Sequence, residues 1–107
     1  MNTLLRPALY GARHRVAVAG KEQAGGRATL CGRICENTDI FAAGIPFPAV
    51  AEGDLVIFHD CGAYAAAMAF PYNGRLRPAE ALCDAGTARL ITPAETPEEY
   101  LGRFDGR

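Results

Sequence analysis

The stretch GDLVIFH at residues 53–59 carries the strongest structural signal in the chain. Gly53 and Asp54 are turn residues, and the five residues that follow are apolar, β-branched or aromatic, as in a strand. Further strand candidates lie at residues 14–19, 27–34, 39–43, 79–83 and 87–92. Short strands at regular spacing with Gly and Pro turns predict a mainly β fold, a small Greek-key-like β-barrel or sandwich. We expect residues 14–19 and 27–34 to pair as a hairpin.

One or two short helices should accompany the strands. Residues 64–70 are rich in alanine and end before Pro71, so they predict about two helical turns. Near the end of the chain, Thr96 is a good N-cap, Pro97 suits the first helical position and Glu99 completes a capping box. This second helix should run to about Phe104.

The composition limits the class of protein. A chain of 107 residues, 50% of them hydrophobic, suits one small domain. With 11 basic and 12 acidic residues the net charge is −1, and no basic stripe suggests a nucleic-acid partner. No apolar run approaches the roughly 20 residues of a membrane span, and residues 1–7 do not resemble a secretory signal. A cytoplasmic protein without nucleic-acid or membrane partners is therefore expected.

The cysteines and the lysine bear on cofactor chemistry. Cys31 and Cys35 have a spacing that allows a metal site, but the chain has no CxxC pair, so we expect no metal centre. Three of the four cysteines, Cys31, Cys61 and Cys83, are interpreted as small buried hydrophobic residues of a cytosolic protein. Lys21 is the only lysine and lies in a segment of turn composition, unlike a lysine that forms a Schiff base in a buried site.

Three ordered segments resemble one family. They are Arg6-Pro7-Ala8-Leu9-Tyr10, then GRICENTD at residues 32–39, then a set from Gly53-Asp54-Leu55 through DCGAY at 60–64 and Met68 to YNGR at 72–75 and RPAE at 77–80. In this order and spacing they resemble the C-terminal region of diaminopimelate decarboxylase and, more broadly, of the ornithine, diaminopimelate and arginine decarboxylases. The resemblance covers Met1 to about Thr92.

The resemblance implies that residues 1–107 are the C-terminal β-barrel domain of an enzyme that uses pyridoxal 5′-phosphate. In that family a TIM-like barrel domain, absent from this chain, carries the Schiff-base lysine and the glycines that hold the cofactor phosphate. Met1 matches an internal methionine of full-length relatives. We therefore expect a fragment, an internal start or one half of a split enzyme, which would assemble with a barrel half and form a homodimer.

The resemblance also assigns the reaction centre. Cys35 matches the cysteine that reprotonates the α-carbon after decarboxylation, in the active site of the partner subunit, and a thiol suits that role near neutral pH. Tyr64 matches the tyrosine whose hydroxyl contacts the cofactor phosphate and also borders the substrate.

Four residues match positions that recognise the substrate. Glu36 matches the carboxylate that binds the distal ammonium group. Arg6 and Tyr10 match the pair that binds the distal carboxylate of diaminopimelate, a role for which the planar guanidinium is suited. Tyr72 is expected to line the pocket. Asn37 stands where the family most often has serine.

Two other functions remain open from the sequence. A non-catalytic decarboxylase-like regulator would keep the dimerisation surface, although it would not need Arg6, Tyr10, Cys35, Glu36 or Tyr64. A small metal- or ligand-binding barrel is supported only by the number of cysteines. The preferred hypothesis is a part of a decarboxylase of lysine biosynthesis, inactive as a single chain.

Overall fold

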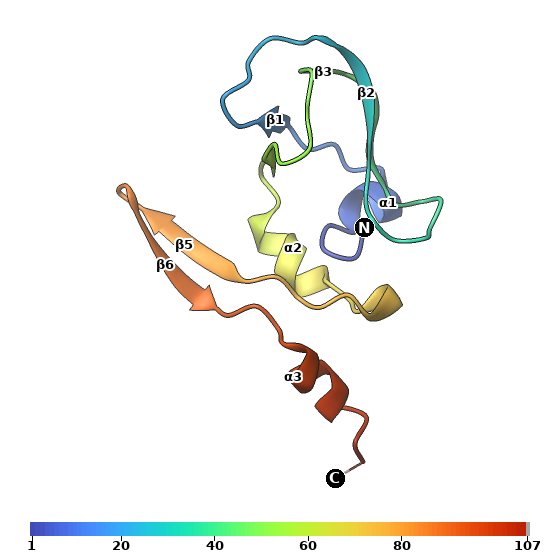
Figure 1. Cartoon of the computed structure of the whole chain (residues 1–107), viewed down its shortest axis with the longest axis vertical. Coiled ribbons are helices and arrows are strands. Elements are labelled where there is room, and N and C mark those ends of the chain that lie inside the picture. The colour runs from blue at the N-terminus through green and yellow to red at the C-terminus, as the bar shows by residue number, and fades with distance from the viewer. Residues whose placement is uncertain (107) are drawn as a thin grey trace.

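The computed structural model describes residues 1–106 and contains three separate two-stranded antiparallel sheets (Figure 1). The elements in chain order are α1 (Arg6–Tyr10), β1 (Val16–Val18), β2 (Gly26–Cys31), β3 (Ile40–Phe47), β4 (Val56–Phe58), α2 (Gly62–Met68), the 3-10 turn η1 (Tyr72–Gly74), β5 (Glu80–Asp84), β6 (Thr87–Thr92) and α3 (Pro97–Gly102). The prediction of a mainly β fold is confirmed. Within residues 1–106 the strands do not close into a barrel.

The predicted hairpin of residues 14–19 and 27–34 is wrong. β1 pairs with β4, Val16 opposite Phe58 and Val18 opposite Val56, while β2 pairs with β3. Directly after β1 the chain turns back, and the Lys21 N–H donates to the Val18 carbonyl at 3.1 Å. The Lys21 ammonium also reaches the Asp54 carboxylate, 2.5 Å away, just before β4. The loop after β1 therefore lies beside the start of β4, and β2 begins a sheet of its own.

The β2–β3 pair extends further than expected. β3 continues through Pro46, which lies opposite Arg27, although the prolines predicted loop-like backbone there. A proline lacks the N–H for a ladder bond and is tolerated where that position faces no third strand. In a two-stranded sheet both strands are edges, so Pro46 leaves the pairing intact.

The β5–β6 hairpin projects away from the other two sheets (Figure 1). Its turn residues Ala85 and Gly86 both have positive φ, 46° and 80°. Positive φ at both central positions is typical of a type I′ turn, whose twist matches that of the paired strands. All residues of β6 are exposed, so this hairpin adds little to the interior.

The helices agree largely with the sequence. α2 ends at Met68, slightly earlier than predicted. In α3 the capping box is confirmed, because the Thr96 hydroxyl accepts from the Glu99 N–H at 3.2 Å and the Glu99 carboxylate accepts from the Thr96 N–H at 2.8 Å. α1 was not expected. It is one short turn with Pro7 near its start and Gly11, at φ 66°, as its C-cap.

The buried core is small and lies between the first two sheets and the N-terminal segment. The buried apolar residues of the described chain are Leu4, Val18, Ile34 and Phe47. The rings of Phe41 and Phe58 pack 4.9 Å apart and join the β2–β3 sheet to the β1–β4 sheet. No helix within residues 1–106 has the length and apolar character that crossing a membrane requires.

Candidate functional site

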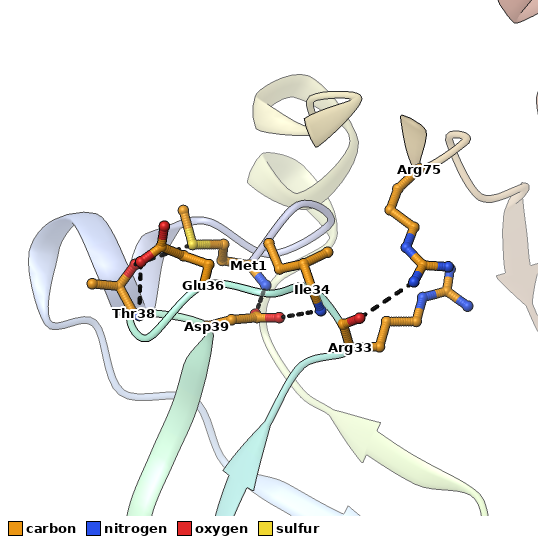
Figure 2. A network of polar contacts seen from close by, with 7 residues as sticks. All are labelled: Met1, Arg33, Ile34, Glu36, Thr38, Asp39 and Arg75. Carbon is orange, nitrogen blue, oxygen red and sulfur yellow. Dashed lines mark hydrogen bonds and ion pairs between the residues drawn. The ribbon is translucent and has the colours of Figure 1, made fainter. Parts of the chain in front are cut away.

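A tight turn at residues 32–39, here named the Cys35 turn, connects β2 to β3 and is organised by Asp39 (Figure 2). The Asp39 side chain is 2% exposed. Its Oδ2 accepts from the Ile34 N–H at 3.2 Å, and its Oδ1 pairs with the Met1 nitrogen. The Gly32 N–H donates to the Asp39 carbonyl at 2.7 Å, closing the base of the turn.

Cys35 and Glu36 lie at the tip of this turn. Ile34 is buried and anchors the turn, whereas Cys35 is exposed. The Glu36 carboxylate bends back along its own turn, where Oε1 accepts from the Thr38 N–H at 3.2 Å and from the Thr38 hydroxyl at 3.1 Å (Figure 2). The turn therefore presents a thiol outward and keeps the neighbouring carboxylate in a defined orientation.

The η1 turn lies against the Cys35 turn. The Asn73 amide donates to Cys35 Sγ at 3.2 Å, and the Arg75 guanidinium donates to the Arg33 carbonyl at 3.3 Å (Figure 2). Tyr72, which precedes Asn73, is 43% exposed and packs beside Phe70 with ring centroids 6.3 Å apart. Tyr72 is thus the sequence neighbour of a residue that touches the predicted catalytic thiol.

Arg6 and Tyr64 form a second group. α1 presents Arg6 and α2 presents Tyr64, and the guanidinium carbon lies 4.9 Å from the centre of the Tyr64 ring. At this distance the cation stacks on the ring face. Tyr64 is 54% exposed, so its hydroxyl can reach a ligand. Tyr10 is 66% exposed at the end of α1.

The structure therefore gathers five of the six predicted site residues into two groups. Arg6 joins Tyr64, and Cys35 lies with Glu36 beside the turn that carries Tyr72. Tyr10, at the end of α1, is brought into neither group. In the part of the chain described, no hydrogen bond or ion pair connects the first group to the second. The sequence gives Asn73 only as part of the YNGR segment and predicts Asp39 as the start of a strand, so their contacts within the site are not expected from it.

An apolar cleft of about 910 Å³ opens between the N-terminal segment, α2 and β5. Its lining includes Leu4, Cys31, Phe41, Phe58, Cys61 and Ala65. None of the six predicted site residues lines it, but Gly32 and Arg33 at the start of the Cys35 turn do, so the cleft borders the candidate site. No group of three or more possible metal ligands occurs within residues 1–106. The expectation that Cys31, Cys61 and Cys83 are buried is wrong, because Cys31 and Cys83 are exposed and Cys61 is half-buried.

Lys21 is engaged elsewhere. Its ammonium donates to the Ala49 carbonyl at 3.0 Å and pairs with Asp54. The hydrogen bond from Lys21, together with one from the Ala51 N–H, lowers the pKa of Asp54 below its ordinary value of 3.8. The only lysine of the chain therefore has a structural role between two loops.

Comparison with known proteins gives a consistent result. Residues 1–62 match the family described as pyridoxal-dependent decarboxylase, C-terminal sheet domain. The chain is 44% identical to Protein TabA of Pseudomonas amygdali pv. tabaci over 95% of its own length and 25% of that protein. It is 48% identical to diaminopimelate decarboxylase of Archaeoglobus fulgidus over 89% of its own length and 23% of that protein. The chain thus spans about a quarter of the length of the curated relatives it matches.

A solved structure agrees over nearly the whole chain. Diaminopimelate decarboxylase from Helicobacter pylori, complexed with L-lysine, superposes with a TM-score of 0.89 at 30% identity. The match covers 97% of this chain and 26% of the other. The arrangement of three small sheets and three helices is therefore that of a known domain.

Proposed function

This chain belongs to the pyridoxal-dependent decarboxylases, as the C-terminal sheet domain of that family, and we propose that it completes the active site of an enzyme resembling diaminopimelate decarboxylase. The reaction would be the removal of one carboxylate from an amino acid with a distal charged end. The observation that carries the proposal is the pairing of Arg6 with Tyr64 from two separate helices. It supplies a cation and a phenol side by side on an accessible surface.

The residues present fit one end of pyridoxal 5′-phosphate. The exposed Tyr64 hydroxyl is a neutral donor suited to a phosphate oxygen, and the cation beside it favours an anion. The only lysine is held by Asp54 and by a backbone carbonyl. The covalent attachment of the cofactor is therefore assigned to a barrel domain, on the same gene or on a separate chain.

The side chains of this domain supply proton transfer and substrate binding. When bound, pyridoxal phosphate would supply an electron sink for decarboxylation at the α-carbon of the substrate. Cys35 at the tip of its turn delivers the proton to that carbon. Glu36 binds the distal ammonium of the substrate, and Arg6 with Tyr10 binds the distal carboxylate. Tyr72 borders the same pocket.

The substrate class is supported by the relatives. The Helicobacter pylori neighbour is a diaminopimelate decarboxylase that binds L-lysine, and lysine carries a distal ammonium. A carboxylate such as Glu36 matches that group in charge. Arg6 adds recognition of a second carboxylate, which favours diaminopimelate over a simple diamine precursor. We place the enzyme in lysine biosynthesis, as a cytoplasmic homodimer in which Cys35 serves the partner's site.

A chimera tests this function. The matching C-terminal region of the Archaeoglobus fulgidus enzyme is replaced by residues 1–107, and lysine formation from meso-diaminopimelate is measured. We expect turnover by the chimera and none by the 107-residue chain alone, because the chain lacks a free lysine for the cofactor. Arg6→Ala should raise KM about tenfold or more, since a charge-assisted bond is lost.

Two results would count against the proposal. A folded, dimeric chimera without turnover would favour the regulator hypothesis. Turnover by the isolated chain would overturn the assignment of the covalent site to another domain.

A further inference from the structure

Asn73 has an unusual backbone conformation, and its side chain is not needed to close its own turn. It adopts the left-handed conformation, φ 58° and ψ 31°, inside η1, a region that asparagine, aspartate and glycine tolerate best. The turn is closed by backbone bonds alone, from Gly74 N–H to the Pro71 carbonyl at 3.0 Å and from Arg75 N–H to the Tyr72 carbonyl at 3.4 Å. The Asn73 side chain is therefore available for another partner.

That partner is the sulfur of Cys35. Asn73 Nδ2 lies 3.2 Å from Cys35 Sγ, across a separation of 38 residues in sequence. The contact is supported from both sides. Arg75 ties η1 to the Cys35 turn through the Arg33 carbonyl, and Asp39 fixes the base of that turn. Two rigidly connected turns thus bring an amide donor to the thiol.

We propose that Asn73 is a positioning residue that holds the Cys35 sulfur for proton transfer, an inference that rests on the proposed function. In this step the S–H bond breaks and its proton bonds to the α-carbon that carries the electron pair left by carbon dioxide. The sulfur becomes a thiolate and regains a proton from water. An amide N–H can donate to sulfur before and after the transfer, so it keeps Sγ in one place throughout.

Asn73→Asp and Asn73→Gly separate this role from turn formation. Both replacements tolerate the left-handed backbone, so η1 should persist. Aspartate keeps the shape of the side chain but replaces the donor with an anion, and glycine removes the side chain. Asn37→Asp is the matched control, because it adds the same charge to the exposed tip of the Cys35 turn. Among the described contacts only Asn73 donates to Cys35 Sγ.

The first readout is the alkylation rate of each cysteine in the 107-residue chain, resolved by peptide mapping. The thiolate is the reactive form, so a carboxylate beside the sulfur should slow alkylation of Cys35 in Asn73→Asp by about tenfold. Cys31, Cys61 and Cys83 serve as internal references and should be unchanged. In Asn37→Asp the Cys35 rate should change by less than about twofold. Equal Cys35 rates in the two aspartate variants would overturn the proposal.

The second readout is the split between kcat and KM in the active chimera. Asn73→Gly should lower kcat about fivefold, the value of one lost hydrogen bond, and leave KM unchanged. In a Cys35→Ala background the same change should have no further effect, because the two residues act as a unit. Additive losses would instead assign Asn73 a purely structural role. If the chimera is inactive, the proposed function fails, and the alkylation rates still decide whether Asn73 governs the thiol.

Discussion

Gly32 is the residue on which the shape of the Cys35 turn depends most directly. A Cβ at this position would overlap the Asp39 carboxylate, which is buried and already bonded to Ile34. The carboxylate cannot move away without losing the bond that holds the turn. Glycine is needed here for close approach, and its φ lies outside the left-handed region.

Gly32→Ala should therefore destabilise the chain by about 1–3 kcal/mol, the usual cost of forcing atoms into filled space. Urea denaturation followed by circular dichroism measures this difference. Gly26→Ala is the control, because no atom lies within 4 Å of a Cβ built there, and its effect should stay within about 0.5 kcal/mol. Equal effects of the two substitutions would show that the Asp39 carboxylate is not the reason why position 32 requires glycine.

At the scale of elements, the Lys21–Asp54 pair lies beside the β1–β4 sheet. It joins the loop after β1 to the loop before β4 and thereby supports the β1–β4 sheet. The folded-state pKa of Asp54 is lowered, chiefly by the hydrogen bond from Lys21. A lowered pKa means that the stabilisation is complete above the ordinary value of 3.8 and is lost as the pH falls through the folded-state pKa.

Asp54→Asn should accordingly be less stable than the natural chain at about pH 6, with the difference vanishing at about pH 2. The free energy of unfolding, measured by urea titration across this range, tests the expectation. Glu52→Gln, a substitution at an exposed neighbour, should leave the acid dependence unchanged. A difference between Asp54→Asn and the natural chain that persists at the lowest pH would contradict the role of the ion pair.

The elements also show what sequence could predict. Local chemistry located the strands and two of the helices, because β-branched runs, Gly turns and the Thr96 capping box act within a few residues. The pairing of β1 with β4 joins residues far apart in sequence, as does the Lys21–Asp54 pair beside it, so local patterns do not predict it. The Asn73–Cys35 contact was missed for the same reason. The motif resemblance predicted Cys35 and Glu36 as site residues. The residues that hold them in place were identified only from the structure.

At the scale of the whole molecule, much apolar surface faces outward. Four apolar residues of the described chain are buried, while Leu82, Leu90, Ile91 and Leu101 are 45–62% exposed. Most of these lie on the projecting β5–β6 hairpin, both strands of which have free edges. Free edges and exposed apolar patches both favour association with another chain.

The isolated chain should therefore self-associate as its concentration rises, which sedimentation velocity can follow. Leu90→Glu should shift the distribution toward monomer, because it places a charge on the hairpin face. Val50→Glu changes an exposed valine outside the strands and should have little effect. A monomer at all concentrations would show that the β5–β6 hairpin does not drive self-association.

The separation of the three small sheets also has a consequence for the lifetime of the chain in a cell. Proteases cut backbone that opens, and a domain with so small an interior opens readily. Covering its apolar face with another domain would protect the backbone and slow cleavage. Degradation would then remove copies that have no partner, so the amount of this chain would follow the amount of the proposed barrel domain.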